Sequence, residues 1–265
     1  MMTRRQFTGS AALAAACVGP APAAERLRIG IGTYSYHSLT LEAMVAELKA
    51  LGIDEIEMSR GEFMLLSHPD EDRFRSARAL FDKAVIRCVS YYAATIHDGR
   101  ELELAVRFAR ILGATNITGD GVGAALLKLI DESCTRAGLS FGIHNHFFKE
   151  KFAYESPEDV LRGLKGLSRT MGATLDTGQF ASCGYDTVYA VRKLGPYLKL
   201  VHLKDVAAAG GEENVLIGRG VAKIPAVMAE LKKLNFRGLV AIEYEKEGPV
   251  EEDLRKEVAF ARGLA

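Results

Sequence analysis

Four short segments in the second half of this 265-residue sequence place side chains that bind metals or move protons directly after apolar runs. One ligand-type side chain from each would give two imidazoles and two carboxylates. Such a set suits a divalent first-row cation such as Mn²⁺, Zn²⁺, Co²⁺ or Fe²⁺. A lone histidine or aspartate in such a place is ordinarily a packing residue or a helix cap, so the prediction of a metal site depends on all four occurring in order. The segments are Ile143-His144-Asn145-His146, Leu175-Asp176-Thr177-Gly178-Gln179, Val201-His202-Leu203-Lys204-Asp205 and Ile242-Glu243-Tyr244-Glu245.

The elements that must position these segments alternate between strand and helix along the chain. Apolar β-type runs predict strands at 27–36, 53–58, 87–92, 115–118, 140–146, 173–177, 199–204 and 239–244. A helical pattern follows each strand, and the helices have recognisable start and stop residues. The predicted caps and stops are Thr40, Gly52, Asp98, Gly113, Gly138 and Ser156. Eight strand–helix pairs predict an α/β fold, a single (β/α)8 TIM barrel, over residues 25–265.

An open doubly wound sheet is the alternative arrangement of alternating strands and helices. It should carry a glycine-rich phosphate loop after its first strand, whereas Gly30-x-Gly32 is followed by Thr33-Tyr34-Ser35-Tyr36 with no third glycine. No linker or change of composition divides the chain, so one domain is expected. The catalytic residues of a TIM barrel lie at the C-terminal ends of its strands, which is where the four segments fall.

The first 24 residues are predicted to be a secretory signal outside the fold. Arg4-Arg5-Gln6-Phe7 precedes an uncharged run, and Ala21-Pro22-Ala23 supplies a small-x-small cleavage site. The arginine pair predicts a twin-arginine signal, and hence a periplasmic or secreted protein. Cys17 lies in a poor lipobox, with Leu13 one place too early, which disfavours lipid anchoring.

Composition and charge exclude several classes of protein. The 34 basic and 34 acidic residues balance, whereas nucleic-acid-binding proteins usually carry a basic surplus. No long charge-free apolar stretch follows the N-terminal run, so an integral membrane protein is not expected. Beyond the signal, Cys88, Cys134 and Cys183 are too few, and odd in number, for a disulfide framework.

These motifs together resemble the xylose isomerase-like TIM barrels, the sugar phosphate isomerase/epimerase superfamily. That group includes ketose 3-epimerases, inosose dehydratases, hydroxypyruvate isomerases and endonuclease IV-type nucleases. The resemblance implies one divalent metal ion held by His144, Asp176, His202 and Glu243. The matching motifs are Gly52-Ile53-Asp54-Glu55-Ile56-Glu57, the His144-Asn145-His146 segment, Leu175-Asp176-Thr177, His202-Leu203-Lys204-Asp205, Gly218-Arg219-Gly220 and Ile242-Glu243.

Two positions depart from the family's epimerases. Those enzymes usually have glutamate where this chain has His144, and that glutamate forms an acid/base pair with the glutamate of the eighth strand. They also usually have histidine where this chain has Gln179. The His-Asn-His form, with Glu150 shortly after, looks more like members that act on keto sugars and glycosides.

The chemistry that the resemblance implies is removal of a proton next to a sugar carbonyl, with a metal stabilising the enediolate as a Lewis acid. We expect Glu243 to take the proton, with Glu150 or His146 as the partner acid. Lys204 is expected to neutralise the developing oxyanion. The expected substrate contacts are His146, Glu57 and Gln179. Glu57 is equally suited to an ion pair with a lysine or an arginine.

Three functions remain open at this level. The first is a metal-dependent sugar isomerase or epimerase, and the second is a metal-dependent lyase or dehydratase acting on a keto-sugar or 3-keto-glycoside. The third is a non-catalytic carbohydrate-binding barrel. A nuclease is disfavoured because only three of the six histidines fall at family ligand positions. The expected partner is a small-molecule sugar, and the fold permits a homo-oligomer.

Overall fold

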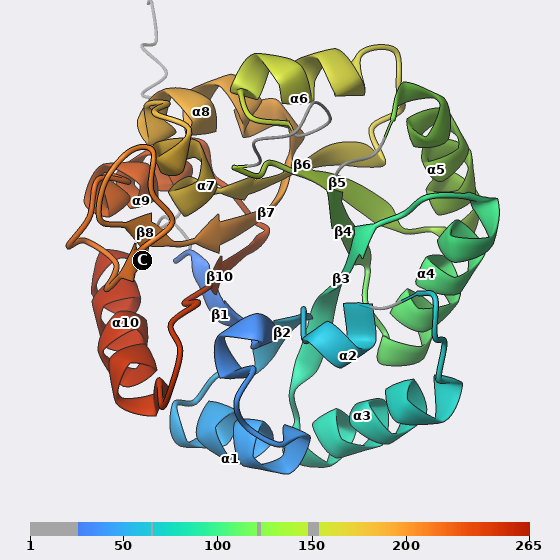
Figure 1. Ribbon diagram of the computed structural model, residues 1–265, viewed down its shortest axis with the longest axis horizontal. Helices are drawn as coiled ribbons and strands as arrows, with labels where there is room; N and C mark the ends of the chain where they lie inside the picture. Colours follow the sequence, from blue (N-terminus) through green and yellow to red (C-terminus); the bar gives the residue numbers. More distant parts are fainter. Residues whose placement is uncertain (1–25, 65, 121–122, 148–153) are drawn as a thin grey trace, which may run out of the picture.

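The structure, a computed structural model, describes residues 26–64, 66–120, 123–147 and 154–265. Eight parallel strands close into a barrel in the order β1-β10-β7-β6-β5-β4-β3-β2, ringed by helices (Figure 1). The predicted TIM barrel is therefore confirmed. The barrel strands are β1 Arg28–Gly32, β2 Glu55–Met58, β3 Arg87–Thr95, β4 Asn116–Asp120, β5 Ser140–His144, β6 Met171–Asp176, β7 Leu198–Leu203 and β10 Leu239–Ile242.

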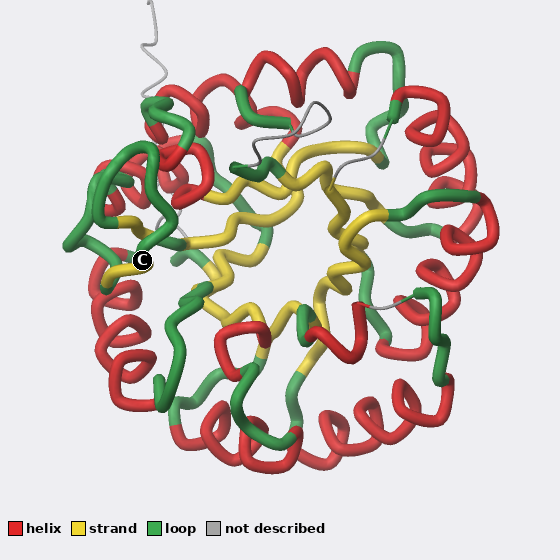
Figure 2. The backbone as a smooth tube through the Cα atoms, viewed as in Figure 1, coloured by secondary structure: helices red, strands yellow, loops and turns green. Residues whose placement is uncertain are grey.

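The helices form a continuous outer ring around the strands (Figure 2). The longer ones are α1 Leu41–Ala50, α3 Glu71–Ala84, α4 Gly99–Leu112, α5 Ala124–Ala137, α6 Pro157–Leu164, α8 Thr187–Leu194, α9 Ile224–Lys233 and α10 Glu251–Leu264. Short elements are the helices α2 Gly61–Met64 and α7 Thr177–Ser182, the 3-10 turns η1 Thr33–Tyr36 and η2 Gly195–Tyr197, and the hairpin of β8 Asp205–Val206 with β9 Asn214–Val215. No helix in the described residues is long and apolar enough to cross a membrane.

Capping residues set several helix ends as the sequence predicted. Ser156 and Asp159 form a reciprocal capping box at α6, with Pro157 at the first helical position, where its missing N–H costs no hydrogen bond. Gly113 and Gly138 end α4 and α5 in the left-handed conformation, with φ of 74° and 69°. These signals fix the start of α6 and the ends of α4 and α5.

Four strands are shorter than predicted, and two of them are the second, which begins at Glu55, and the eighth, which ends at Ile242. The first ends at Gly32 rather than at residue 36, because the chain turns into η1. The fifth ends at His144 rather than at residue 146. Short element α7 was not predicted; it begins directly after β6, where the Asp176 side chain accepts a hydrogen bond from Gln179 N at 2.8 Å.

The barrel interior holds both apolar and polar side chains, and it is polar near the C-terminal ends of the strands. Leu200, Leu239 and Ala241 form a small apolar cluster. Alternate residues of a strand share a face, and the inward-facing side chains nearer the mouth are hydroxyls and a carboxylate: Ser90, Thr118, Thr174 and Glu57. Glycine at 142 makes room for this layer, since a Cβ there would lie 2.2 Å from Thr174 Oγ1.

Candidate metal centre

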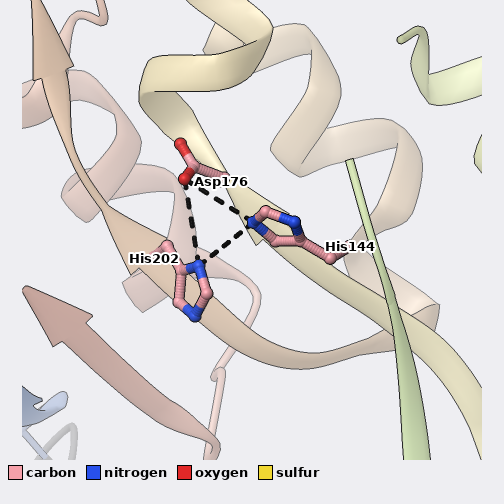
Figure 3. A group of neighbouring side chains, drawn as sticks. All are labelled: His144, Asp176 and His202. Atoms are coloured by element: carbon pink, nitrogen blue, oxygen red, sulfur yellow. Dashed lines mark hydrogen bonds and ion pairs between the residues drawn. The ribbon is translucent and has the colours of Figure 1, made fainter. Parts of the chain in front are cut away.

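Three ligand-type side chains meet at the ends of neighbouring strands (Figure 3). His144 ends β5, Asp176 ends β6 and His202 lies in β7, and all three are buried. His144 Nε2 lies 3.2 Å from His202 Nδ1, and Asp176 Oδ2 lies 3.7 and 3.8 Å from these two nitrogens. The sequence prediction that these three residues converge is thus confirmed in position.

Glu243 joins the group directly after β10. Its Oε2 lies 2.9 Å from His202 Nδ1 and, like Asp176 Oδ2, is buried without a hydrogen-bond partner in the described part of the chain. Buried carboxylate oxygens are costly unless they are paired or coordinate a metal. Asp176 Oδ2 and the two imidazole nitrogens lie within 4.8 Å of one another, and Glu243 Oε2 lies beside His202. This donor set fits a first-row divalent cation.

The charges of the group are mutually dependent. Burial alone would raise the pKa of Glu243, but His202 and Lys204 hold it well below its usual range. Burial alone would lower the pKa of His202, but Glu243 and Glu57 raise it well above the ordinary value. Burial alone would raise the pKa of Asp176, but Lys204 and His144 hold it below its usual value. Ionised carboxylates around a protonated imidazole form a site in which a divalent cation can replace the proton.

Glu57, at β2, lies one layer below the group. Its Oε2 is 2.5 Å from His202 Nε2, while its Oε1 accepts hydrogen bonds from Ser90 Oγ at 2.8 Å and Thr118 Oγ1 at 2.6 Å. The side chain is fully buried. Because both oxygens have protein partners, Glu57 does not occupy the substrate-contact position that the sequence suggested. It holds His202 instead, as carboxylates commonly hold metal-binding histidines.

Asn145 ties the ends of β5 and β6 together. Its Oδ1 accepts a hydrogen bond from Asp176 N at 2.8 Å, and its Nδ2 donates one to Asp176 O at 3.0 Å. Both polar atoms of the side-chain amide therefore bind the backbone of a predicted metal ligand. Gln179 adds a second link, since its Oε1 accepts from Phe147 N at 2.9 Å. Its Nε2 has no hydrogen-bond partner among the described residues. These contacts fix the carboxylate of Asp176 relative to His144.

Lys204 is buried beside the candidate metal site. Its Nζ lies 2.6 Å from Glu245 Oε2 and 4.0 Å from Asp176 Oδ2. Burial alone would lower the pKa of Lys204, but Asp176, Glu243 and Glu245 raise it above its usual value. A permanently charged ammonium at this position can stabilise negative charge on a bound molecule.

The Gly218-Arg219-Gly220 motif packs around the carboxylate of Asp205. Asp205 Oδ2 accepts from Gly218 N and Gly220 N, each at 2.9 Å, and its Oδ1 accepts from Ala222 N at 2.9 Å. The amides of this motif are therefore used to hold the loop that precedes α9.

Two predicted residues complete the account of the site. His146 lies next to His144, with ring centroids 5.7 Å apart, and burial together with the neighbouring His144 lowers its pKa to about 4. Glu150 lies outside the described residues, as does the predicted signal over residues 1–24.

A pair at the mouth that was not predicted from the sequence is Tyr92 of β3 and Asp120 of β4. Tyr92 Oη donates to Asp120 Oδ2 at 3.1 Å, and its ring lies against His144 and His202, at 5.4 and 6.3 Å between centroids. Burial and Asp120 keep the pKa of Tyr92 well above its usual value. The strand-end rule that found the other residues would have found Asp120 too, had the fourth strand been extended beyond residue 118.

Comparison with known proteins gives a family and several structural relatives. The family model described as xylose isomerase-like TIM barrel matches residues 15–264. No curated protein matches the sequence significantly.

Several solved structures share the fold of this chain over most of its length. An uncharacterized protein from Parabacteroides distasonis ATCC 8503 is 25% identical, with a TM-score of 0.67 over 90% of this chain and 99% of its own. The probable 3-DHS dehydratase AsbF of Bacillus anthracis, involved in petrobactin synthesis, is 12% identical, with a TM-score of 0.72 over 88% and 98%. A D-psicose 3-epimerase from Clostridium cellulolyticum H10, solved with D-tagatose, is 12% identical, with a TM-score of 0.71 over 90% and 99%.

Proposed function

The chain belongs to the xylose isomerase-like TIM barrel family, and we propose that it is a divalent-metal-dependent sugar isomerase or epimerase. The observation that carries the proposal is the convergence of His144 Nε2, Asp176 Oδ2 and His202 Nδ1, with Glu243 Oε2 2.9 Å from His202. A D-psicose 3-epimerase and a probable 3-DHS dehydratase share the fold of this chain. One divalent ion (Mn²⁺, Zn²⁺, Co²⁺ or Fe²⁺) would be held by these four side chains.

The bound cation would supply Lewis-acid polarisation of a sugar carbonyl and of the hydroxyl beside it. Glu243 then removes the proton from the carbon next to the carbonyl, and the electron pair of the broken C–H bond enters the enediolate. Lys204 lies where its charge stabilises the developing oxyanion. The free Nε2 of Gln179 and the ring of His146 contact substrate hydroxyls.

A second candidate reaction follows from the residue at the end of β5. His144 stands there, so the described part of β5 offers no carboxylate to return a proton to the enediolate. If the enediolate instead loses a β-hydroxyl or β-alkoxy group, the protein is a lyase or dehydratase acting on a keto-sugar or 3-keto-glycoside.

One experiment separates these reactions. The metal-loaded protein is incubated in deuterated water with D-fructose, D-psicose, D-tagatose and 3-keto-glucosides, and the products are followed by NMR. Deuterium at a sugar carbon with the skeleton intact supports the isomerase or epimerase. Release of water or of the aglycone supports the lyase, and no reaction with any sugar despite bound metal supports a carbohydrate-binding barrel.

We also propose that the protein is exported through the twin-arginine pathway. The proposal depends on the Arg4-Arg5-Gln6-Phe7 start and the uncharged run after it. Replacing both arginines with lysine should retain the full-length precursor in the cytoplasmic fraction, whereas an unchanged periplasmic fraction would refute it.

A further inference from the structure

Asp120 lies on the opposite side of the barrel mouth from Glu243. Glu243 follows β10 and Asp120 ends β4, and these strands are four places apart in the closed order β10-β7-β6-β5-β4. In a ring of eight strands, four places is half the circumference. Figure 1 shows β4 and β10 facing each other across the central space.

Strand parity points the Asp120 side chain into the mouth. Asn116 and Thr118 face the interior, since Asn116 Nδ2 donates to Ser90 Oγ and Thr118 Oγ1 donates to Glu57. Asp120 is two residues further along β4 and shares this face. The last paired residues of the two strands are Gly119 and Ile143, so Asp120 ends β4 at the level where His144 ends β5. Asp120 is itself buried.

The end of β3 is deformed in a way that holds Asp120 in place. The β3–β4 register shifts between Tyr92 and Thr95, and Ala94 has a φ of 47°. This irregularity lets both Tyr92 and Thr95 reach the same carboxylate, with Thr95 Oγ1 at 3.5 Å from Asp120 Oδ1. Bulges and left-handed non-glycine residues cost stability and are concentrated near active sites.

We propose that Asp120, positioned by Tyr92, is the second proton-transfer carboxylate of the site. The proposal rests on the proposed enediolate chemistry and makes it specific, because two carboxylates on opposite sides predict inversion at a sugar carbon. A 1,2-isomerisation needs proton transfer on one face only. The reaction is therefore an epimerisation.

The two carboxylates each exchange one proton with the same sugar carbon. Glu243 takes the proton from one face, and the C–H electron pair enters the enediolate. The acid form of Asp120 then gives its proton to the same carbon from the other face, where a new C–H bond forms. In the reverse direction Asp120, as the carboxylate, takes the proton and Glu243 returns it. The Tyr92 hydroxyl donates to the carboxylate form and orients it towards the substrate.

The test compares Asp120→Asn, Tyr92→Phe and the control Asp131→Asn in metal-loaded protein. Asp131 lies on α5, away from the mouth, where it accepts hydrogen bonds from Ser168 and Thr170. Two rates are measured in deuterated water with the ketose epimers: deuterium entry into each starting epimer, and conversion of one epimer to the other. The affinity for Mn²⁺ is measured by calorimetry on the same preparations.

We expect Asp120→Asn to slow interconversion by about 10²–10⁴-fold, the usual contribution of one acid–base group. Deuterium entry into the epimer whose proton faces Glu243, and the affinity for Mn²⁺, should stay near the parent values. Tyr92→Phe should slow interconversion less than Asp120→Asn does, again with deuterium entry and Mn²⁺ affinity near the parent values. Asp131→Asn should change none of the three. The role of Asp120 would be overturned if Asp120→Asn, with Mn²⁺ affinity retained, slowed deuterium entry and interconversion equally or slowed neither. Absence of deuterium entry into any ketose with the parent protein would overturn the proposed function, and this inference with it.

Discussion

Replacing Glu57 with glutamine should reverse the position of the proton on His202. When a cation is bound, the carboxylate would accept the His202 Nε2 proton and leave the Nδ1 lone pair, beside Glu243, Asp176 and His144, to the cation. In Glu57→Gln, Ser90 and Thr118 still donate to the side-chain oxygen, so the amide NH₂ must face Nε2. His202 then accepts at Nε2 and carries its proton on Nδ1, where the cation would bind.

The size of the effect follows from the burial of this contact. Glu57 and His202 are both almost fully inaccessible to solvent, so no water can replace the lost acceptor. Loss of a carboxylate that holds a metal-binding histidine typically weakens metal affinity about 10- to 100-fold. That corresponds to about 1.4–2.8 kcal/mol of binding free energy.

The assay is calorimetric titration of metal-free protein with Mn²⁺, Co²⁺ and Zn²⁺, with circular dichroism to confirm folding. Ser90→Ala serves as the control, because it removes one hydrogen bond to Glu57 but keeps the carboxylate on His202. We expect Glu57→Gln to lose affinity and Ser90→Ala to keep it. If both variants bind all three ions as the parent does, Glu57 does not orient a metal ligand and the reasoning is wrong.

Three further predictions concern stability. Burial raises the pKa of Glu257 from 4.5 to about 8, so between these pH values the folded state binds one proton more than the unfolded state. The free energy of unfolding should therefore fall as pH rises through this window, by up to about 1.4 kcal/mol per pH unit. Glu257→Gln should abolish this slope in urea melts from pH 5 to 8, and a slope identical to the parent's would contradict the assignment. Gly30→Ala should cost about 1–3 kcal/mol in the same assay, because its Cβ would lie 2.3 Å from Glu55 O; an unchanged midpoint would show that the barrel accommodates it. Asp205→Ala should lower the free energy of unfolding by about 2 kcal/mol or more, because it leaves several amides of the loop before α9 without their acceptor. A urea midpoint equal to that of the parent would mean that water replaces the carboxylate.

The eight-fold alternation of strand and helix was sufficient to predict the barrel, because both the periodicity and the caps are local signals. Ser156-Pro157 and the glycines after α4 and α5 set their helix ends by contacts within a few residues. Local patterns also identified His144, Asp176 and His202. Once a strand is recognised, the rule that catalytic residues lie at the C-terminal ends of barrel strands locates these side chains. The rule failed for Asp120 because the predicted fourth strand stopped two residues early.

The role of Glu57 could not be predicted, because it depends on a contact across the barrel. Its partner His202 is 145 residues away in the sequence. From the strand alone, a glutamate at this position is equally suited to binding a substrate hydroxyl or an arginine. Only the closure of the strands shows that both oxygens are satisfied inside the protein. The hairpin of β8 and β9 was also missed, because strands of two residues carry no periodicity.

Metal analysis of purified protein tests whether strands β5, β6, β7 and β10 build a metal centre. Parent protein is loaded with Mn²⁺, desalted and measured beside Asp176→Ala and the control Asp131→Asn, with folding checked for each. We predict one tightly held ion per chain in the parent and the control, and loss of that ion in Asp176→Ala. Equal metal in Asp176→Ala, or none in the parent with any of the four candidate ions, would contradict the account.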